Sequence, residues 1–202
     1  MKKLLFLFLS LVAINLFAED NYEVGVAFGR PDSNDFGEVL SSQTAPYSTN
    51  TKVVMIDVGY KIVDDAFDLP LDFYVKGGFA KFFENGYADD VYENTLYIKA
   101  YYTFDVLKNA FRLGFAEGAS YTYGTLHVEK LDAIKNHGKN SHYLNYLELS
   151  LDYDLGNIVD STAFKKLYLG VEIKHRSGIF GLINNVKHGG SNYEVMYIEK
   201  NF

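Results

Sequence analysis

Three residues near the C-terminus have the chemical types that hydrolyse esters: a histidine, a serine and a glutamate. His175 and Ser177 lie two residues apart, and Glu194 follows across a loop rich in glycine and asparagine. In nucleophilic catalysis a histidine takes the serine proton, and a carboxylate orients the imidazole. These roles require segments 166–178 and 193–202 to be neighbouring strands, so the rest of the chain decides whether the three side chains meet.

The N-terminus predicts an exported protein. Two lysines after the initiator methionine precede an apolar stretch over residues 4–17, and Ala18 is a small residue at the expected cleavage point. This pattern is typical of a secretory signal peptide, and the apolar stretch is short for a transmembrane helix. We therefore expect residues 1–18 to be a signal peptide and residues 19–202 to form one domain.

The composition argues against several classes of function. Without Lys2 and Lys3, 17 Lys and Arg face 26 Asp and Glu, and the net charge falls from −7 to −9. Nucleic-acid-binding proteins instead have basic patches. The absence of cysteine excludes disulfides and thiolate catalysis, and no later segment is long and apolar enough for a transmembrane helix. Tyr and Phe together make up 16% of the chain, which favours strands and membrane interfaces.

Eight segments, most of about nine to twelve residues, alternate apolar and polar side chains, and this period of two predicts strands. Strands of about ten residues match a tilted bilayer crossing. The polar face carries charged or small residues that suit a barrel lumen, among them Asp57, Lys61, Lys99, Arg112, Glu148, Asp152, Glu172 and Lys174. The sequence therefore predicts an all-β fold, an eight-stranded antiparallel transmembrane β-barrel.

The connections between these segments predict their orientation in a membrane. Every odd-numbered segment is joined to the next by a long polar loop, such as residues 30–50 and 122–141, and the other connections, such as residues 105–110, are shorter. Outer-membrane barrels show this alternation, with both termini in the periplasm. The terminal Phe202 resembles the C-terminal signature of outer-membrane proteins, although Lys200 stands where an apolar residue is usual. We expect export through the periplasm into a bacterial outer membrane.

The same alternation predicts where the candidate catalytic residues point. His175 and Ser177 continue the apolar parity of the seventh segment, and Glu194 shares the apolar parity of the eighth. All three are therefore expected on the lipid-facing wall, near the extracellular end. The alternative is that they are polar residues at the membrane rim, where charge costs only about 0–1 kcal/mol.

The expected contact among them depends on the strand register. If Leu167 pairs with Phe202, His175 lies opposite Glu194 and Ser177 lies opposite Asn192. Directly opposed residues have Cβ atoms about 5 Å apart, so this register would bring the three groups together.

These features together resemble the PagL family of lipid A deacylases, through the signal peptide, the eight strands, the late His-x-Ser and the glutamate on the last strand. Residues 113–121 and 144–147 are also similar to acyloxyacyl hydrolase-like sequences. The resemblance implies a nucleophile at Ser177, a base at His175 and an acid at Glu194, on the outer wall of the barrel. It further implies hydrolysis of an acyl ester of lipid A in the outer leaflet, as by a lipid A 3-O-deacylase.

The resemblance also sets the expected partners. They are lipid A or lipopolysaccharide and the surrounding outer-membrane lipid, with no nucleic acid, and a homodimer is left open. No metal or cofactor is needed for this chemistry, and the other histidines show no ligand spacing. The alternative function is a non-enzymatic small outer-membrane barrel, structural or with adhesin-like loops.

One departure from the family concerns the oxyanion donor. The asparagine that usually follows the serine is Gly178 here, and candidate replacements are Asn145, Asn192, Asn184 and backbone amides near Gly178. Glu117 shares lipid-facing parity with its neighbours, and we expect it at a bulge or at the rim. Contacts with lipid A phosphates could come from Lys135, Lys139, Lys187 and His188.

Overall fold

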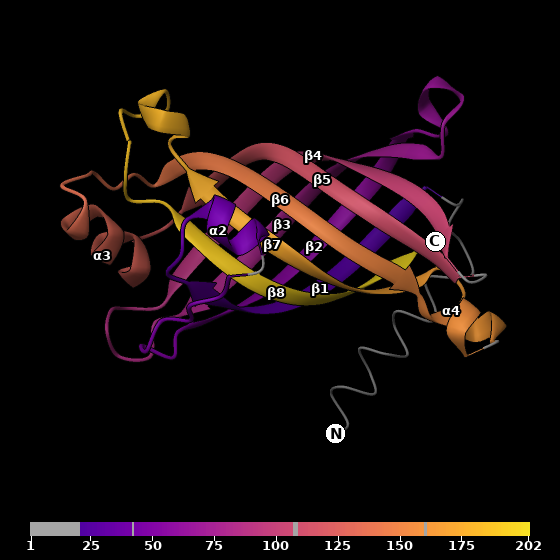
Figure 1. Ribbon diagram of the computed structural model, residues 1–202, viewed down its shortest axis with the longest axis horizontal. Coiled ribbons are helices and arrows are strands. Elements are labelled where there is room, and N and C mark those ends of the chain that lie inside the picture. The colour runs from indigo at the N-terminus through magenta and orange to yellow at the C-terminus, as the bar shows by residue number, and fades with distance from the viewer. Residues whose placement is uncertain (1–20, 42, 107–108, 160) are drawn as a thin grey trace.

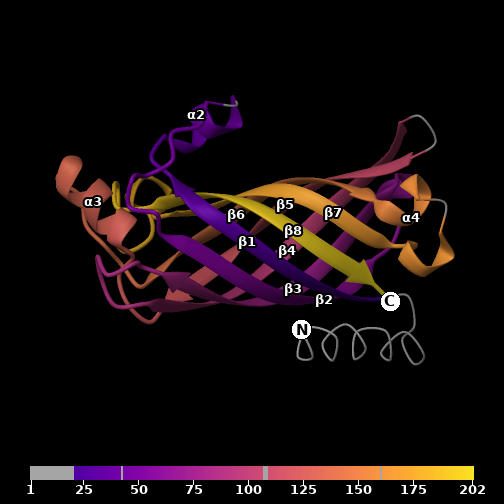
Figure 2. The same cartoon turned by 90° about the horizontal axis from the view of Figure 1, so that it is seen from below.

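The computed structural model describes residues 21–41, 43–106, 109–159 and 161–202. The expected signal peptide lies outside these residues. Eight antiparallel strands follow one another in sequence order and close into a barrel through pairing of the first with the last (Figures 1 and 2). The prediction of an eight-stranded antiparallel barrel is therefore confirmed.

The strands are β1 (Tyr22–Asp32), β2 (Lys52–Val63), β3 (Leu71–Phe83), β4 (Val91–Val106), β5 (Asn109–Thr122), β6 (Tyr143–Asp154), β7 (Leu167–Ser177) and β8 (Ser191–Asn201). The connections carry short helices, α2 (Phe36–Leu40), α3 (His127–Lys135) and α4 (Leu155–Ile158), and 3-10 turns η1 (Ala66–Asp68), η2 (Thr162–Phe164) and η3 (Ile179–Gly181). Among the described helices, none has the length and hydropathy to cross a membrane.

Each strand presents apolar side chains outward and polar side chains into the lumen, as the alternation predicts. Leu96 on β4 is 63% exposed and Met196 on β8 is 61% exposed, and all the other strands carry similar outward residues. An apolar belt of this extent is unfavourable in water and indicates a surface that contacts lipid.

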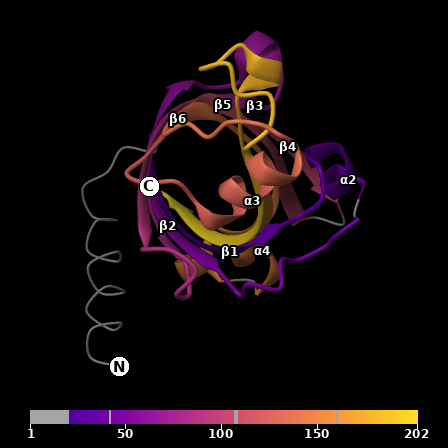
Figure 3. The same cartoon turned by 90° about the vertical axis from the view of Figure 1, so that its left-hand side faces the viewer.

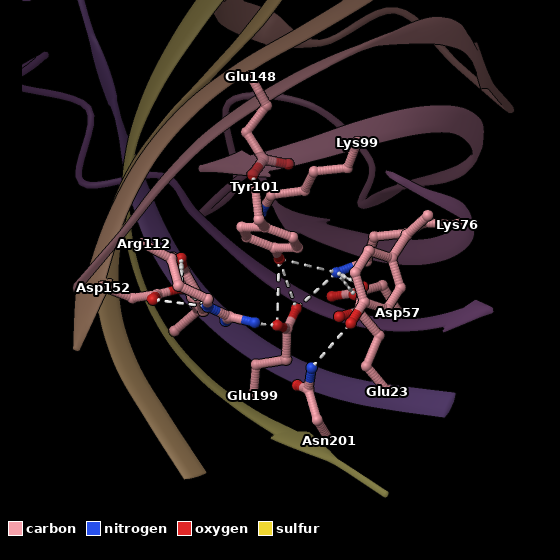
Figure 4. Close-up of polar contacts among 12 residues, drawn as sticks. Glu23, Asp57, Lys76, Lys99, Tyr101, Arg112, Glu148, Asp152, Glu199 and Asn201 are labelled. Atoms are coloured by element: carbon pink, nitrogen blue, oxygen red, sulfur yellow. Dashed lines mark hydrogen bonds and ion pairs between the residues drawn. The ribbon is translucent and has the colours of Figure 1, made fainter. Parts of the chain in front are cut away.

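The lumen is filled by a network of paired charges (Figure 4). Lys76 lies 2.8 Å from Glu23, 2.7 Å from Asp57 and 2.5 Å from Glu199. Arg112 contacts Glu199 at 2.7 Å and also pairs with Asp152. Because nearly all of these groups are buried and paired with one another, this part of the interior is a polar core.

The expected alternation of loop lengths is wrong at two connections. The β3–β4 connection is short, residues 84–90, because these strands run on for 13 and 16 residues and include positions expected in a loop. Conversely, the β6–β7 connection was expected to be short, but it spans residues 155–166 and contains α4 and η2. Alternation of side chains therefore predicted the strands better than it predicted where they end.

The end of the barrel away from the C-terminus, which we call the distal end, is covered by loops. Helix α3 lies across its opening (Figure 3), and the buried side chains of Leu126 and Val128 join an apolar cluster with Tyr193 of β8. The outer ends of β7 and β8, which carry the candidate catalytic residues, lie at this end.

Candidate active site

His175 and Ser177 lie on the outer wall of the barrel, as their parity predicts. Lys174 and Arg176, which alternate with them on β7, are buried in the lumen at 1% and 0% exposure. Successive side chains of a strand point to opposite faces, so the histidine and serine face outward at the distal end.

The expected pairing of His175 with Glu194 is wrong by two residues. Leu167 pairs with Lys200, which places His175 opposite Asn192 and Ile173 opposite Glu194. Phe202 lies beyond this β7–β8 register and instead exchanges backbone hydrogen bonds of 2.8 and 3.2 Å with Tyr22 at the start of β1.

Asn192 takes the position beside the imidazole that was expected for the glutamate. Its Oδ1 lies 2.6 Å from Nδ1 of His175, and its Nδ2 donates to the Asn34 carbonyl oxygen at 2.8 Å. An amide oxygen can only accept a hydrogen bond, so Nδ1 carries the proton and Nε2 is left unprotonated in the neutral ring. The His175 ring also packs against Phe36 of α2, with centroids 4.6 Å apart.

Glu194 has another partner. Its Oε2 accepts hydrogen bonds from Arg30 of β1 at 2.9 Å and 3.0 Å. Within the described residues, no hydrogen bond joins Glu194 to His175, so the carboxylate is not in contact with the imidazole.

Ser177 lies on the same face as His175, two residues along β7, a spacing of about 7 Å between Cα atoms. Its Oγ accepts a hydrogen bond from the Ile179 amide at 3.4 Å. No His175–Ser177 hydrogen bond is found in the described part of the chain. The hydroxyl must therefore turn from the Ile179 amide towards the imidazole before any proton transfer, as is common in sites without substrate.

Gly178 occupies a position where no side chain fits. A Cβ there would lie 2.6 Å from the Val186 Cβ and closer still to the Val186 carbonyl oxygen. The β7–β8 loop folds back over this residue, so an asparagine side chain has no room here.

One cleft of about 620 Å³ on the outer wall is lined by His175, Ser177, Gly178 and Asn192. His175, Ser177 and Asn192 form its polar part, and Phe36 and Phe180 contribute its apolar lining. Asn145, Glu117, Lys187 and His188 also line the cleft, whereas Glu194, Lys135 and Lys139 lie outside it. A cleft with polar groups beside an apolar lining suits a ligand with a polar head and an apolar chain.

Two carboxylates that line the cleft hold loops together. Asp132 of α3 accepts a hydrogen bond from the Gly189 amide at 2.6 Å, and Asp32 accepts one from the Ala45 amide at 2.7 Å. Burial, together with these two carboxylates, raises the pKa of the cleft residue Tyr47. The phenol therefore remains a neutral donor at physiological pH.

Glu117 faces outward without a bulge. The β4–β5 and β5–β6 registers run past it without a shift, opposite Ile98 and Leu147. Of the two expected positions, a bulge or the rim, the bulge is wrong, and the residue lines the cleft from the neighbouring strand.

The sequence analysis missed the contribution of the β1–β2 loop. Asn34 and Phe36 contact Asn192 and His175 although well over a hundred residues separate them in the chain. Closure of the barrel was the available signal, because it brings the end of β1 beside the start of β8, where Asp32 pairs with Asn192.

Comparisons with known proteins identify the fold. No protein-family model matches the sequence, and no curated protein matches it. The crystal structure of the outer membrane enzyme PagL is similar with a TM-score of 0.61 and 12% identity, over 89% of this chain and 99% of that one. Neisserial surface protein A is similar with a TM-score of 0.50 and 16% identity, over 91% and 98%. The chain thus has the fold of eight-stranded outer-membrane barrels.

Proposed function

We propose that this protein is an outer-membrane serine esterase that hydrolyses an acyl ester of lipid A. The observation that carries this proposal is the hydrogen bond from His175 Nδ1 to Asn192 Oδ1, beside Ser177, in a cleft on the apolar outer wall. This contact leaves the Nε2 lone pair free to act as a base.

The location of the cleft supports a lipid substrate. The outward belt of the barrel contacts the bilayer, and termini on the periplasmic side put the distal end in the outer leaflet. Substrate would then approach sideways through the membrane. Lipid A is the acylated lipid of that leaflet in the organisms whose lipid A deacylases this sequence resembles.

The mechanism begins with proton transfer from Ser177 Oγ to His175 Nε2. Oγ attacks the ester carbonyl carbon, the carbonyl π electrons move onto oxygen, and collapse of the tetrahedral intermediate expels the sugar alkoxide, which takes the proton from Nε2. Water then attacks the acyl-serine ester with His175 again as base. The acyl chain leaves as a fatty acid and the serine is restored.

In this mechanism Asn192 orients the imidazole, a role that asparagine also fills in Cys-His-Asn hydrolases. Glu194 is not part of the reacting group, because Arg30 neutralises its carboxylate. The pair instead joins β1 to β8 on the outer wall next to the cleft.

The test is lipid A mass spectrometry on cells that express the wild type or Ser177→Ala. We expect the wild type to remove one acyl chain and the variant to remove none. Ser41→Ala is a matched control, because Ser41 is exposed in the β1–β2 loop outside the cleft, and it should act like the wild type. Identical spectra for wild type and Ser177→Ala would contradict the proposal and favour a passive surface barrel.

A further inference from the structure

Asn145 is a buried amide that the proposed reaction has not yet used. It lies on β6, pairs directly with Ser177 across the β6–β7 ladder, and lines the same cleft. The residue is only 6% exposed, and in the described part of the chain its side chain makes no hydrogen bond. Its amide atoms are not among the fully buried unpaired polar atoms of the described residues, so they reach the cleft, where a ligand group can pair with them.

The orientation of Asn145 follows from the alternation of β6. Its neighbours Leu144 and Tyr146 are buried on the lumen side, so Asn145 faces outward, like Ser177. Directly opposed residues have Cβ atoms about 4.5–5.5 Å apart. A carbonyl carbon attacked by Ser177 would therefore lie close to Asn145. The oxygen of that carbonyl group could then accept a hydrogen bond from the Asn145 amide.

The other candidate side chains for this role are engaged or absent. Gly178 has no side chain and no room for one. Asn192 uses its oxygen on His175 and its nitrogen on Asn34. Asn184 donates from Nδ2 to Ser141 Oγ at 2.8 Å and to the Tyr143 carbonyl oxygen at 3.0 Å.

We propose that Asn145 Nδ2 forms the side-chain part of the oxyanion hole. The inference rests on the proposed esterase function. As Ser177 Oγ bonds to the carbonyl carbon, the carbonyl oxygen gains the π electron pair, and the Asn145 N–H hydrogen bond to this oxygen strengthens. A donor beside the position where the charge develops stabilises that charge in the transition state. The chain thus replaces the missing asparagine after the serine with one from the adjacent strand.

The test measures fatty acid release from purified lipid A by the refolded full chain in detergent. Asn145→Ala should lower kcat about 10²–10³-fold with little change in KM, because the contact forms mainly in the transition state. Asn145→Asp keeps the shape but replaces the donor with an acceptor of negative charge, and it should be at least as slow.

Two controls separate this inference from folding and from the proposed function. Asn94→Ala changes an exposed asparagine of β4 that lies outside the cleft, and it should keep the wild-type kcat. Folding is checked by the heat-dependent shift in gel mobility of each variant. If the wild type is active and folded Asn145→Asp retains its kcat, Asn145 is not the donor although the esterase stands. If the wild type releases no fatty acid, the esterase is contradicted and the oxyanion role falls with it.

Discussion

At the residue scale, the outer wall holds a histidine that is oriented by an amide. His175 donates from Nδ1 to Asn192, and the amide itself is held by Asn34. An amide fixes the tautomer as a carboxylate would, but it offers no negative charge to the imidazolium that forms during catalysis. The residue that orients His175 can therefore be identified by changing charge and hydrogen bonding separately.

Changes at Asn192 and Glu194 test which residue orients the base. Asn192→Ala removes the acceptor of Nδ1–H, and we expect kcat to fall roughly 10²–10⁴-fold, the usual contribution of a positioned base. Glu194→Gln keeps the shape and removes the charge, and it should stay within a few-fold of the wild type. The measurement is the rate of fatty acid release from lipid A.

Asn192→Asp completes this series. Unlike Asn192→Ala, it keeps an acceptor for the His175 Nδ1–H group, and it adds negative charge beside the imidazole. We expect it to keep most of the activity or to exceed the wild type. A large loss in Glu194→Gln with none in Asn192→Ala would instead identify Glu194 as the acid, as the family resemblance implies.

Residue types and parity predicted which side chains share the outer wall, but not which of them touch. The positions of His175 and Ser177 on one face follow from a period of two, a property of any strand. The register of β7 against β8 depends on Phe202, whose hydrogen bonds are to Tyr22 on β1. Such a contact joins the first strand to the last residue, and local alternation carries no information about it.

At the element scale, β7 is fixed from inside the barrel at the point where the site begins. Arg176, between His175 and Ser177, forms an ion pair with Glu129 of α3 and lies 3.3 Å from Glu93 of β4. Glu129 also accepts a hydrogen bond from Ser191 of β8 at 2.9 Å. Helix α3 therefore ties together the outer ends of the two strands that carry the site.

Removal of this tie should weaken the fold at the distal end. Glu129→Ala leaves the buried Arg176 guanidinium without one of its carboxylates, and loss of one member of a buried pair costs about 3–5 kcal/mol. We expect the free energy of unfolding in urea to fall by about this amount. Lys130→Met, an exposed position on the same helix, is the control and should unfold like the wild type. Equal stability of the two variants would show that α3 does not anchor the strands.

The sequence predicted the strands because each one alternates apolar and polar side chains over about ten residues. The helices of the loops were missed for the opposite reason. Helix α3 has nine residues, and what holds it is Val128 in the apolar cluster and Glu129 on Arg176. Short helices in water are marginal without such packing, so their signal lies in contacts with other elements.

At the scale of the whole molecule, the barrel reverses the usual arrangement of a soluble protein. Apolar side chains face outward to lipid, and much of the interior is filled by ion pairs, beside a smaller apolar cluster that includes Phe82 and Tyr193. Lys76 sits among three carboxylates, Glu23, Asp57 and Glu199 (Figure 4). Because carboxylates this close repel one another when no cation lies between them, we expect the lysine to stabilise the closed barrel.

Lys76→Met should therefore destabilise the protein strongly. It keeps the length of the side chain but leaves the three carboxylates without their shared cation, which we expect to reduce the free energy of unfolding by about 3–5 kcal/mol. The measurement is urea-induced unfolding of the refolded protein in detergent, followed by tyrosine fluorescence and by gel mobility.

Lys81→Met is the matched control, because Lys81 lies on the same strand and pairs with Asp90 at 3.0 Å where both side chains are about a third exposed. An exposed pair is screened by water and contributes little to stability, so this variant should unfold near the wild-type urea concentration. If both variants lose the same small amount, the lumen charges are solvated and do not form the core. A large loss confined to Lys76→Met would instead show that this cluster of charges holds the barrel closed beneath the site.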